Sequence, residues 1–273
     1  MKMKKVVTVA CGALMCLMVL AGCQKKTLTG LERIKQKGTL VLATESTYPP
    51  FQYFIVENGK TINAGLDVDI LKAFTQSIGV QFMTNEMAFD SIIPAVQAGT
   101  ADIGGTFTPT DERALVIDFT ANYYHSEHNI IIRKGEYNLY PTAESFLGKR
   151  LGAQKGSVQE NVIKEIGIQD GLSLPKVTAL IQELVNKNID GIVMDFSVAD
   201  TYGAAYPDLI EKSAVRIPGA NNGIAFVVAK GQEDLVAELD KFITKSVNDG
   251  TVDRLYDKNI KAAIDQILEA TEE

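Results

Sequence analysis

The amino-acid sequence predicts an α/β fold with mainly parallel sheets. Short apolar runs of the kind that form buried strands alternate with segments of helical periodicity along most of its 273 residues. The composition, 46% hydrophobic and 22% charged, is that of a globular protein. Segments that combine aromatic, hydroxyl and charged residues directly follow three of the apolar runs, and the carboxyl ends of parallel strands are where such sheets bind ligands.

The chain begins with a segment typical of a secretory signal. Residues 6–21 form an apolar run that follows Lys2, Lys4 and Lys5, and this run is shorter than the ~20 residues that a permanent transmembrane helix needs. Removing the segment would change the formal net charge from −7 to −10, because it contains these three lysines and no acidic residue. We therefore expect the mature domain to be exported and to work outside the cytoplasm.

The apolar run ends in a motif that resembles a bacterial lipobox, Leu20-Ala21-Gly22-Cys23. The resemblance implies a signal peptide over residues 1–22 and a diacylglycerol group on Cys23. The other two cysteines lie within the signal, so the mature domain has no pair of cysteines for a disulfide. Residues 23–37 are expected to form a tether that holds the domain at the outer face of the bacterial cell membrane.

The strands and helices expected in the first part of the domain follow from local patterns. Residues 40–43 form a nearly continuous apolar run, typical of a strand buried on both faces. The apolar residues of 67–78 recur at helical spacing, and Gly79 can end that helix in the left-handed conformation. Strand, helix and strand are expected next, at residues 80–82, 92–98 and 102–105. The same alternation continues through 129–132, 150–153, 180–185, 191–194 and 224–228, and ends in a helix over 235–242.

The charge and the motifs exclude several functions. The sequence has 27 basic and 34 acidic residues, so we expect no nucleic-acid partner. It contains no glycine-rich nucleotide-binding motif, no GxSxG motif and no HExxH motif. His125 and His128 are spaced to share a metal only on a helix, whereas the residues that follow them are typical of a strand. We therefore expect no metal and no cofactor.

The three polar segments carry the chemistry of a small zwitterion site. They cover residues 45–51, 105–113 and 194–196. The guanidinium of Arg113 can hold a carboxylate through two hydrogen bonds, and the carboxylate of Asp195 can accept from an ammonium group. Aromatic faces accompany both charges.

On these segments the sequence resembles the extracellular solute-binding proteins of the polar amino-acid ABC importers, from about Gly38 to Tyr256. The resemblance rests on ordered blocks at matching spacings, which read TLVLATESTYPPFQYF, AGLDVDILKAF, AFDSIIPAVQAGTADI, TFTPTDERALVIDFTANYY, KRLGAQKGS, IDGIVMD and NNGIAFVVAKG. It implies a bilobed periplasmic-binding-protein fold, in which two α/β lobes are joined by two hinge strands and close on the ligand.

The resemblance also implies the domain limits. Lobe 1 is expected at residues 38–123 and 222–258, and lobe 2 at residues 124–221. Residues 259–273 continue beyond the usual end of the family, and their composition predicts one extra helix.

From the resemblance we assign eleven ligand-binding residues. Arg113 is the expected clamp for the ligand α-carboxylate, and Asp195 the expected acceptor for its α-ammonium group. Hydroxyl groups beside Arg113 and a loop of lobe 2 complete the carboxylate site. An aromatic pair holds the ligand side chain, and an acidic residue faces the far end of that side chain. The full set is Glu45, Tyr48, Phe89, Gly105, Thr106, Thr108, Arg113, Gln154, Ser157, Val158 and Asp195. Two of these depart from the family pattern, because Val158 lacks a hydroxyl and Thr106 replaces a glycine or serine.

Each assignment has a purely structural alternative. Arg113 could pair with neighbouring acidic residues at the surface. Asp195 could cap the helix that follows it. Tyr48 and Phe89 could be core aromatics, and Glu45 could be solvated.

The function implied is that of a monomeric receptor, which delivers a free amino acid to the permease of an ABC importer by hinge closure. Glu45 at the end of an aromatic slot favours a long cationic side chain, so arginine or lysine is expected. Glutamine, cystine or another polar amino acid is the alternative. An enzyme similar to the cyclohexadienyl dehydratases would need Glu45 or Asp195 as a general acid. A sensory receptor lobe is disfavoured, because no transmembrane span follows the domain.

Overall fold

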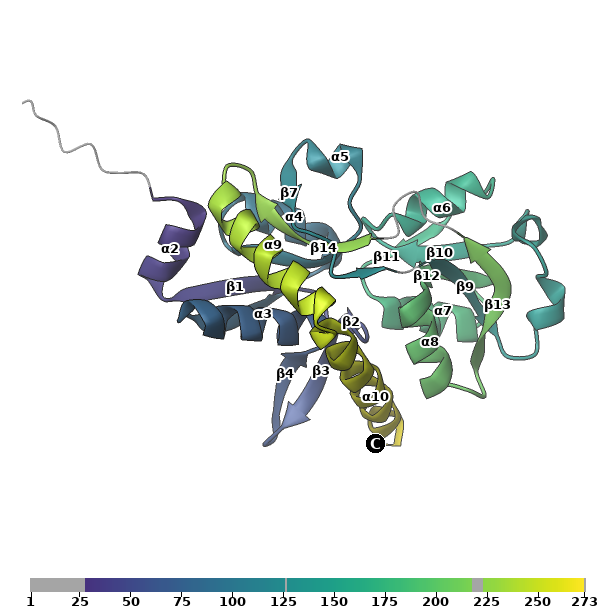
Figure 1. Cartoon of the computed structure of the whole chain (residues 1–273). Helices are drawn as coiled ribbons and strands as arrows, with labels where there is room; N and C mark the ends of the chain where they lie inside the picture. Colours follow the sequence, from purple (N-terminus) through teal and green to yellow (C-terminus); the bar gives the residue numbers. More distant parts are fainter. Residues whose placement is uncertain (1–27, 126, 218–222, 273) are drawn as a thin grey trace, which may run out of the picture.

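A computed structural model describes residues 28–125, 127–217 and 223–272 (Figure 1). The predicted signal peptide and Cys23 lie outside these residues. The described residues form two α/β lobes, each built around one mixed sheet, and this confirms the predicted fold class. A smaller antiparallel sheet is attached to the first lobe.

Lobe 1 contains a sheet with strand order β5-β1-β6-β14-β7, and β8 pairs with the start of β14. The strands β5, β1 and β6 are parallel, whereas β14, β7 and β8 run antiparallel to their neighbours. Their bounds are β1 (Thr39–Thr44), β5 (Gln81–Glu86), β6 (Ile103–Phe107), β7 (Ile117–Phe119), β8 (Tyr124–His125) and β14 (Gly223–Ala229).

Helices bury both faces of the lobe 1 sheet. The helices are α3 (Leu66–Ile78), α4 (Ile92–Gln97) and α9 (Glu233–Asn248). Leu40 and Leu42 pack with α3 and α9, whereas Val41 and Ala43 pack with α4 on the other face. This two-sided burial explains why the first strand is apolar at nearly every position.

Lobe 2 contains a sheet with strand order β11-β10-β12-β9-β13. Here β11, β10 and β12 are parallel, and β9 and β13 are antiparallel to their neighbours. The strands are β9 (His128–Arg133), β10 (Leu151–Gln154), β11 (Leu172–Leu174), β12 (Gly191–Asp195) and β13 (Ile210–Ile217). The helices of lobe 2 are α6 (Gln159–Glu165), α7 (Val177–Val185) and α8 (Phe196–Ala205).

The third sheet was not expected from the sequence. It is an antiparallel arrangement of β2 (Thr47–Tyr48), β3 (Gln52–Glu57) and β4 (Lys60–Ala64). The sequence does carry a hairpin signal, because the β-prone residues 53–56 are followed by Asn58-Gly59, but the sequence analysis did not use it. Its first strand directly follows Glu45, and this places the hairpin beside the cleft between the lobes.

The expected tether is wrong for its second half, because residues 30–37 form helix α2 (Gly30–Lys37). Thr29 and Glu32 make a capping box at the start of this helix, and Gly38 ends it in the left-handed conformation. Ile34 is fully buried, and the N–H of Leu31 donates to Asp234 of α9 at 2.9 Å. The helix is therefore part of lobe 1.

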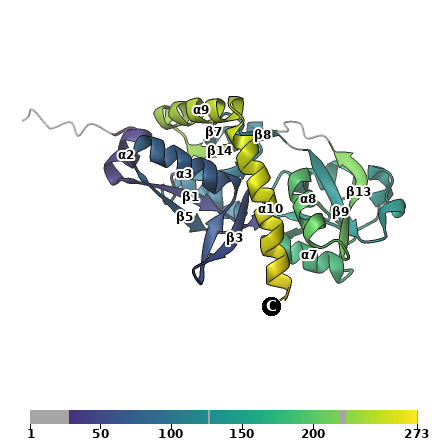
Figure 2. The same cartoon turned by 60° about the horizontal axis from the view of Figure 1, so that its bottom comes forward.

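The stretch expected as an extra C-terminal helix is instead the end of one long helix, α10 (Thr251–Glu272). Helix α10 packs against α3 and α9 of lobe 1 and against α8 of lobe 2. Figures 1 and 2 show it in yellow, lying across the junction of the two lobes. In the part of the chain that the structure describes, no helix combines the length and the apolarity that a membrane span needs.

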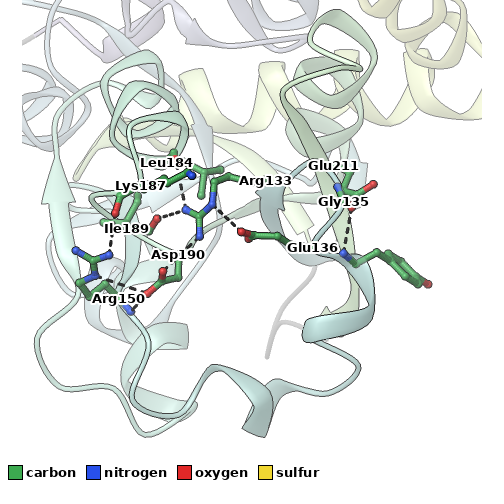
Figure 3. A network of polar contacts seen from close by, with 10 residues as sticks. Arg133, Gly135, Glu136, Arg150, Leu184, Lys187, Ile189, Asp190 and Glu211 are labelled. Carbon is green, nitrogen blue, oxygen red and sulfur yellow. Dashed lines mark hydrogen bonds and ion pairs between the residues drawn. The ribbon is translucent and has the colours of Figure 1, made fainter.

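A polar network closes the edge of lobe 2 that faces away from lobe 1 (Figure 3). Arg133, at the end of β9, donates to the carbonyl oxygens of Leu184 and Ile189 and to the carboxylates of Glu136 and Asp190. Its side chain is only 14% exposed. These contacts join the C-terminal end of α7 to the residues just before β12, because one guanidinium donates to a carbonyl of each.

We predict that Arg133→Met lowers the free energy of unfolding by about 2 kcal/mol, because it leaves partly buried carbonyl and carboxylate groups without their donors. Urea unfolding followed by circular dichroism measures this change. Lys134→Met is the matched control: Lys134 is 53% exposed and makes one surface ion pair, so we expect a loss below about 0.5 kcal/mol. Equal losses in the two variants would contradict the role of the network.

Candidate functional site

Ten of the eleven predicted ligand-binding residues line one cavity between the two lobes. The ten are Glu45, Tyr48, Phe89, Thr106, Thr108, Arg113, Gln154, Ser157, Val158 and Asp195. The eleventh, Gly105, lies in β6 next to Thr106. The cavity lies where β1 and β6 of lobe 1 and β10 and β12 of lobe 2 end, as expected for ligand sites of open α/β sheets.

Arg113 stands in the short helix α5 (Asp111–Ala114) with its guanidinium turned toward lobe 2. Nη1 donates to the carbonyl of Thr108 at 2.8 Å, and Nη2 donates to the carbonyl of Gly156 in lobe 2 at 2.9 Å. The guanidinium also lies over the rings of Phe107 and Phe89, 5.0 and 5.9 Å from their centroids. These contacts leave other N–H groups of the guanidinium to meet a ligand.

Burial lowers the pKa of Arg113 to about 10, although the charge of Glu112 acts in the opposite direction. The guanidinium is therefore still charged at neutral pH. No carboxylate of a described residue lies within 4.0 Å of it, so the alternative of a surface ion pair with its neighbours is wrong. A partly desolvated cation of this kind favours an anionic ligand.

Asp195 serves two purposes at once. It is the last residue of β12 and the N-cap of α8, because its Oδ1 accepts from the N–H of Ser197 at 3.0 Å. It is only 5% exposed, and it also lines the cavity. The cap and the cavity-facing carboxylate are therefore compatible, and the helix N-terminus favours the charged form of the side chain.

The two expected aromatic residues lie in the same cavity but have different partners. The hydroxyl of Tyr48 accepts from the N–H of Asp195 at 3.2 Å and from Nε2 of Gln159 at 3.3 Å, so it contacts lobe 2. Burial raises the pKa of Tyr48 well above its usual value, and the hydroxyl stays neutral. Phe89 stacks on Phe107 with centroids 4.6 Å apart.

Glu45 is a buried carboxylate held by both lobes. It follows β1 and is 2% exposed. Its oxygens accept from Oγ1 of Thr47 at 2.9 and 3.0 Å and from Nε2 of Gln154, in lobe 2, at 2.6 Å. Burial raises the pKa of Glu45 to about 7, although the hydrogen bonds from Thr47 and Gln154 act to lower it. The alternative of a solvated Glu45 is wrong.

A third buried carboxylate, Asp67, supports the lobe 1 wall. It accepts from Nε2 of Gln52 at 2.6 Å, from Oγ1 of Thr106 at 2.7 Å and from the hydroxyl of Tyr123 at 2.6 Å. A Cβ atom on Gly105 would lie 2.2 Å from Oδ2 of Asp67. Gly105 thus contributes to the site by having no side chain, because only glycine lets the strand approach this carboxylate so closely.

The expected role of Thr106 as a hydroxyl donor to the ligand is wrong. Its backbone has a φ of 58°, in the left-handed region that β-branched residues rarely adopt. Both its hydroxyl and its N–H donate to Asp67, and its oxygen accepts from Nε2 of Gln52 at 2.8 Å. These bonds hold the unusual conformation, and they leave Thr106 as part of the cavity wall without a donor for a carboxylate.

The expected loop of lobe 2 meets lobe 1 at the mouth of the cavity. Gly156 has a φ of 78°, and a Cβ atom there would lie 2.9 Å from Cβ of Asp90. Nζ of Lys155 pairs with the carboxylate of Asp90 at 2.9 Å. Within the described part of the chain, Oγ of Ser157 is buried and has no hydrogen-bond partner. Val158 follows it and lines the cavity as an apolar wall.

Three cavity residues were missed by the sequence analysis. Gln52 and Gln159 are polar residues without a distinctive pattern around them, and Ile224 lies inside an apolar strand. No short-range signal separates such residues from ordinary scaffold. In residues 28–125, 127–217 and 223–272, no group of three or more His, Cys, Asp or Glu side chains is arranged to hold a metal ion.

Comparison with known families gives one match over most of the chain. Residues 40–262 match the family described as bacterial extracellular solute-binding proteins, family 3. A probable histidine-binding protein of Campylobacter jejuni is 30% identical over 222 residues, which cover 81% of this chain and 84% of that protein. The arginine-binding extracellular protein ArtP of Bacillus subtilis is 28% identical, with 89% and 96% covered.

Solved structures with the same fold include a substrate-binding protein of an amino-acid ABC transporter, AbpA from Streptococcus pneumoniae, bound to L-arginine. The TM-score is 0.81 at 33% identity, and the match covers 85% of this chain and 99% of that one. The fold also occurs in an enzyme, since a membrane-bound lytic murein transglycosylase F of Desulfosudis oleivorans is 24% identical over 86% of this chain and 51% of that protein.

Proposed function

Because the chain belongs to the bacterial extracellular solute-binding proteins of family 3, we propose that it captures a free, basic L-amino acid between its lobes and delivers it to an ABC importer. One observation carries the proposal. The cavity is lined by a half-buried cation from lobe 1, Arg113, and by a buried carboxylate from lobe 2, Asp195. A small zwitterion complements both charges.

The proposed ligand places its α-carboxylate against Arg113. The planar guanidinium suits a carboxylate, and the unpaired hydroxyl of Ser157 gives a second donor from lobe 2. An unpaired buried hydroxyl costs about 1–3 kcal/mol, and a ligand oxygen that accepts from it removes this cost. The α-ammonium group lies against Asp195.

The side chain of the proposed ligand extends between Tyr48 and Phe89 toward Glu45. In the described residues, no lysine or arginine lies within 4.0 Å of Glu45, so its buried charge lacks a close partner. A guanidinium or ammonium group supplies that partner, and its methylene groups can pack against the rings. ArtP and AbpA, which are named for arginine binding or bound to L-arginine, support arginine as the first candidate.

Lobe closure links binding to transport in this proposal. The lobes already contact each other through the bond from Arg113 to Gly156 and through the ion pair of Lys155 and Asp90. A ligand that touches both lobes adds to these contacts only in the closed arrangement, so it shifts the population toward closure. The closed form is the one a permease would recognise.

The same geometry argues against Asp195 as the general acid of a dehydratase. A general acid needs a proton placed on the reacting group. Asp195 accepts from Ser197 as a helix cap, and its N-terminal position favours the charged form. Glu45 is different, because burial raises its pKa to about 7 although the hydrogen bonds from Thr47 and Gln154 act to lower it, so it can hold a proton near neutral pH.

We also propose that the receptor is held outside the cell by a lipid on Cys23. The support is the sequence before the domain, where a basic segment and an apolar run precede Leu20-Ala21-Gly22-Cys23. Only a few residues separate this cysteine from the capped start of α2, so the tether is short. The domain would then stay close to the membrane and its permease.

The carboxylate clamp is tested by Arg113→Ala. We predict at least about a hundredfold loss of affinity for every amino acid that the wild type binds, because charged hydrogen bonds to the common α-carboxylate disappear. Calorimetry against the set of amino acids measures the loss. Arg150→Ala removes an exposed arginine of lobe 2, 61% of whose side chain is accessible, and should leave every affinity unchanged. An unaltered affinity in Arg113→Ala would reject the clamp.

The role of Glu45 is tested by the pH dependence of binding. The pKa of Glu45 is about 7. At pH 6 Glu45 is protonated in most molecules and must lose its proton before it pairs with a cationic side chain, whereas at pH 8 it is already charged in most molecules. We predict that arginine affinity falls about tenfold from pH 8 to pH 6 and that binding at pH 7 releases protons. Glu45→Gln should remove this pH dependence and narrow the preference for arginine over glutamine; a wild-type affinity that is flat between pH 6 and pH 8 counts against the assignment.

The lipid anchor is tested by Cys23→Ala in the full-length chain expressed in a bacterium. The wild type should partition with membranes and carry a lipid on its N-terminal peptide in mass spectrometry. The variant should lose both properties while the purified domain keeps its ligand affinity. Equal membrane partition of the two proteins would disprove the anchor.

A further inference from the structure

Thr47 makes hydrogen bonds to both lobes although it lies outside the cavity. It is a buried residue of β2 in the hairpin of lobe 1. Its hydroxyl donates to both carboxylate oxygens of Glu45, at 2.9 and 3.0 Å. The same hydroxyl accepts from the N–H of Val177 at 3.0 Å, and its carbonyl accepts from the hydroxyl of Tyr202 at 2.9 Å. Val177 and Tyr202 belong to lobe 2.

The bond from Val177 supplies a helix cap that lobe 2 lacks. Val177 is the first residue of α7, and Lys176 before it makes no side-chain cap. The first N–H groups of a helix need acceptors from outside the helix, and a buried N–H without one is costly. Val177 is 1% exposed, so water does not readily replace the threonine. Helix α7 of one lobe is thus capped by a side chain of the other lobe.

We infer that Thr47 is a positioning residue that couples the charge of Glu45 to closure of the lobes, through a cap on α7 that forms only when lobe 2 docks on lobe 1. The inference rests on the proposed binding of a basic amino acid, and it adds the residue that transmits recognition of the side chain to the hinge motion. We call the contact from Val177 through Thr47 to Glu45 the interlobe cap.

The direction of these hydrogen bonds explains the coupling. A threonine hydroxyl has one proton and two acceptor sites. A charged Glu45 can only accept, so it takes the proton of Thr47 and leaves the oxygen to accept from Val177. The bond to a charged carboxylate also polarises the hydroxyl, so the Thr47 oxygen accepts more strongly from Val177 than it would beside a protonated Glu45. The cation that charges Glu45 therefore also favours the cap.

Other charged and titratable groups near Glu45 affect its charge without bonding to the first N–H of α7. Glu86 of β5 raises the pKa of Glu45, and Lys176 before α7 lowers it. The hydroxyls of Tyr48 and Tyr202 also lie near, and burial raises their pKa values well above the usual one, so both stay neutral. The Thr47 hydroxyl, in contrast, bonds both to Glu45 and to the first N–H of α7.

Hydrogen exchange of the unliganded protein tests the cap directly. Thr47→Val keeps the shape of the side chain and removes the hydroxyl, so we expect amide exchange at the start of α7 to become at least about tenfold faster. Thr47→Ser keeps the hydroxyl and should restore protection. Tyr202→Phe, at the same interface, should leave this amide protected. Wild-type exchange in Thr47→Val would overturn the cap, whatever ligand the protein binds.

Calorimetry at pH 6 and pH 8 tests the coupling. We expect Thr47→Val to weaken arginine binding about tenfold at pH 8, where Glu45 is charged, and less than about threefold at pH 6. Tyr202→Phe should weaken binding by the same factor at both pH values, since its bond goes to a backbone carbonyl. Equal losses for Thr47→Val at both pH values would show a merely structural contact and overturn the inference.

A variant on the other side of the contact guards against misfolding of Thr47→Val. Val177→Pro removes the N–H at the first helical position, which proline tolerates, and Lys176 already has φ −122° and ψ 136°, as a residue before proline requires. Val177→Pro should reproduce the pH-dependent loss of arginine affinity. The double variant of Thr47→Val and Val177→Pro should lose no more affinity than either single variant. Additive losses would contradict the interlobe cap. If the wild type binds no basic amino acid, the proposed function fails, while hydrogen exchange still decides the cap.

Discussion

The half-buried guanidinium of Arg113 and the buried carboxyl group of Glu45 line one cavity without forming an ion pair with each other, because each is held by its own neighbours. Arg113 donates to carbonyl groups and lies over aromatic rings, whereas Glu45 accepts from a hydroxyl and an amide. Direct pairing would lower the cost of burying both groups, yet it would leave nothing for a ligand. Because the two groups are not paired with each other, both can form ion pairs with a ligand that carries complementary charges.

The scaffold behind the cavity holds this arrangement through a third buried carboxylate. Asp67 ties Gln52, Thr106 and Tyr123 into lobe 1, and it leaves room only for a glycine at position 105. Its pKa is raised to about 6 by burial, while its hydrogen bonds act to lower it. The wall that carries the ligand contacts is therefore fixed by polar bonds as well as by apolar packing.

Sequence reasoning could predict what depends on local pattern or on ordered motifs. The apolar run at β1 and the helix ended by Gly79 have clear periodicity, and ten of eleven expected ligand residues share one cavity. It missed the hairpin, although the apolar residues 53–56 and Asn58-Gly59 signal one, and it missed the folding of residues 30–37, whose single fully buried apolar side chain is Ile34. It also mistook the direction in which the Thr106 hydroxyl points, because Asp67 is distant in sequence.

Helix α10 touches both lobes, and this has a mechanical consequence. Its first half is fastened to lobe 1, where Asn259 bonds to Asp69 and Tyr53. Tyr256 stacks on Tyr124 in β8, where the chain leaves lobe 1. Its far end lines a groove with Tyr202 of α8 and with Tyr206, which follows α8 in lobe 2. If the lobes move apart, helix α10 must either slide along α8 or lose its contact with it (Figure 2). The free energy of opening therefore depends partly on this contact, which lies outside the ligand cavity.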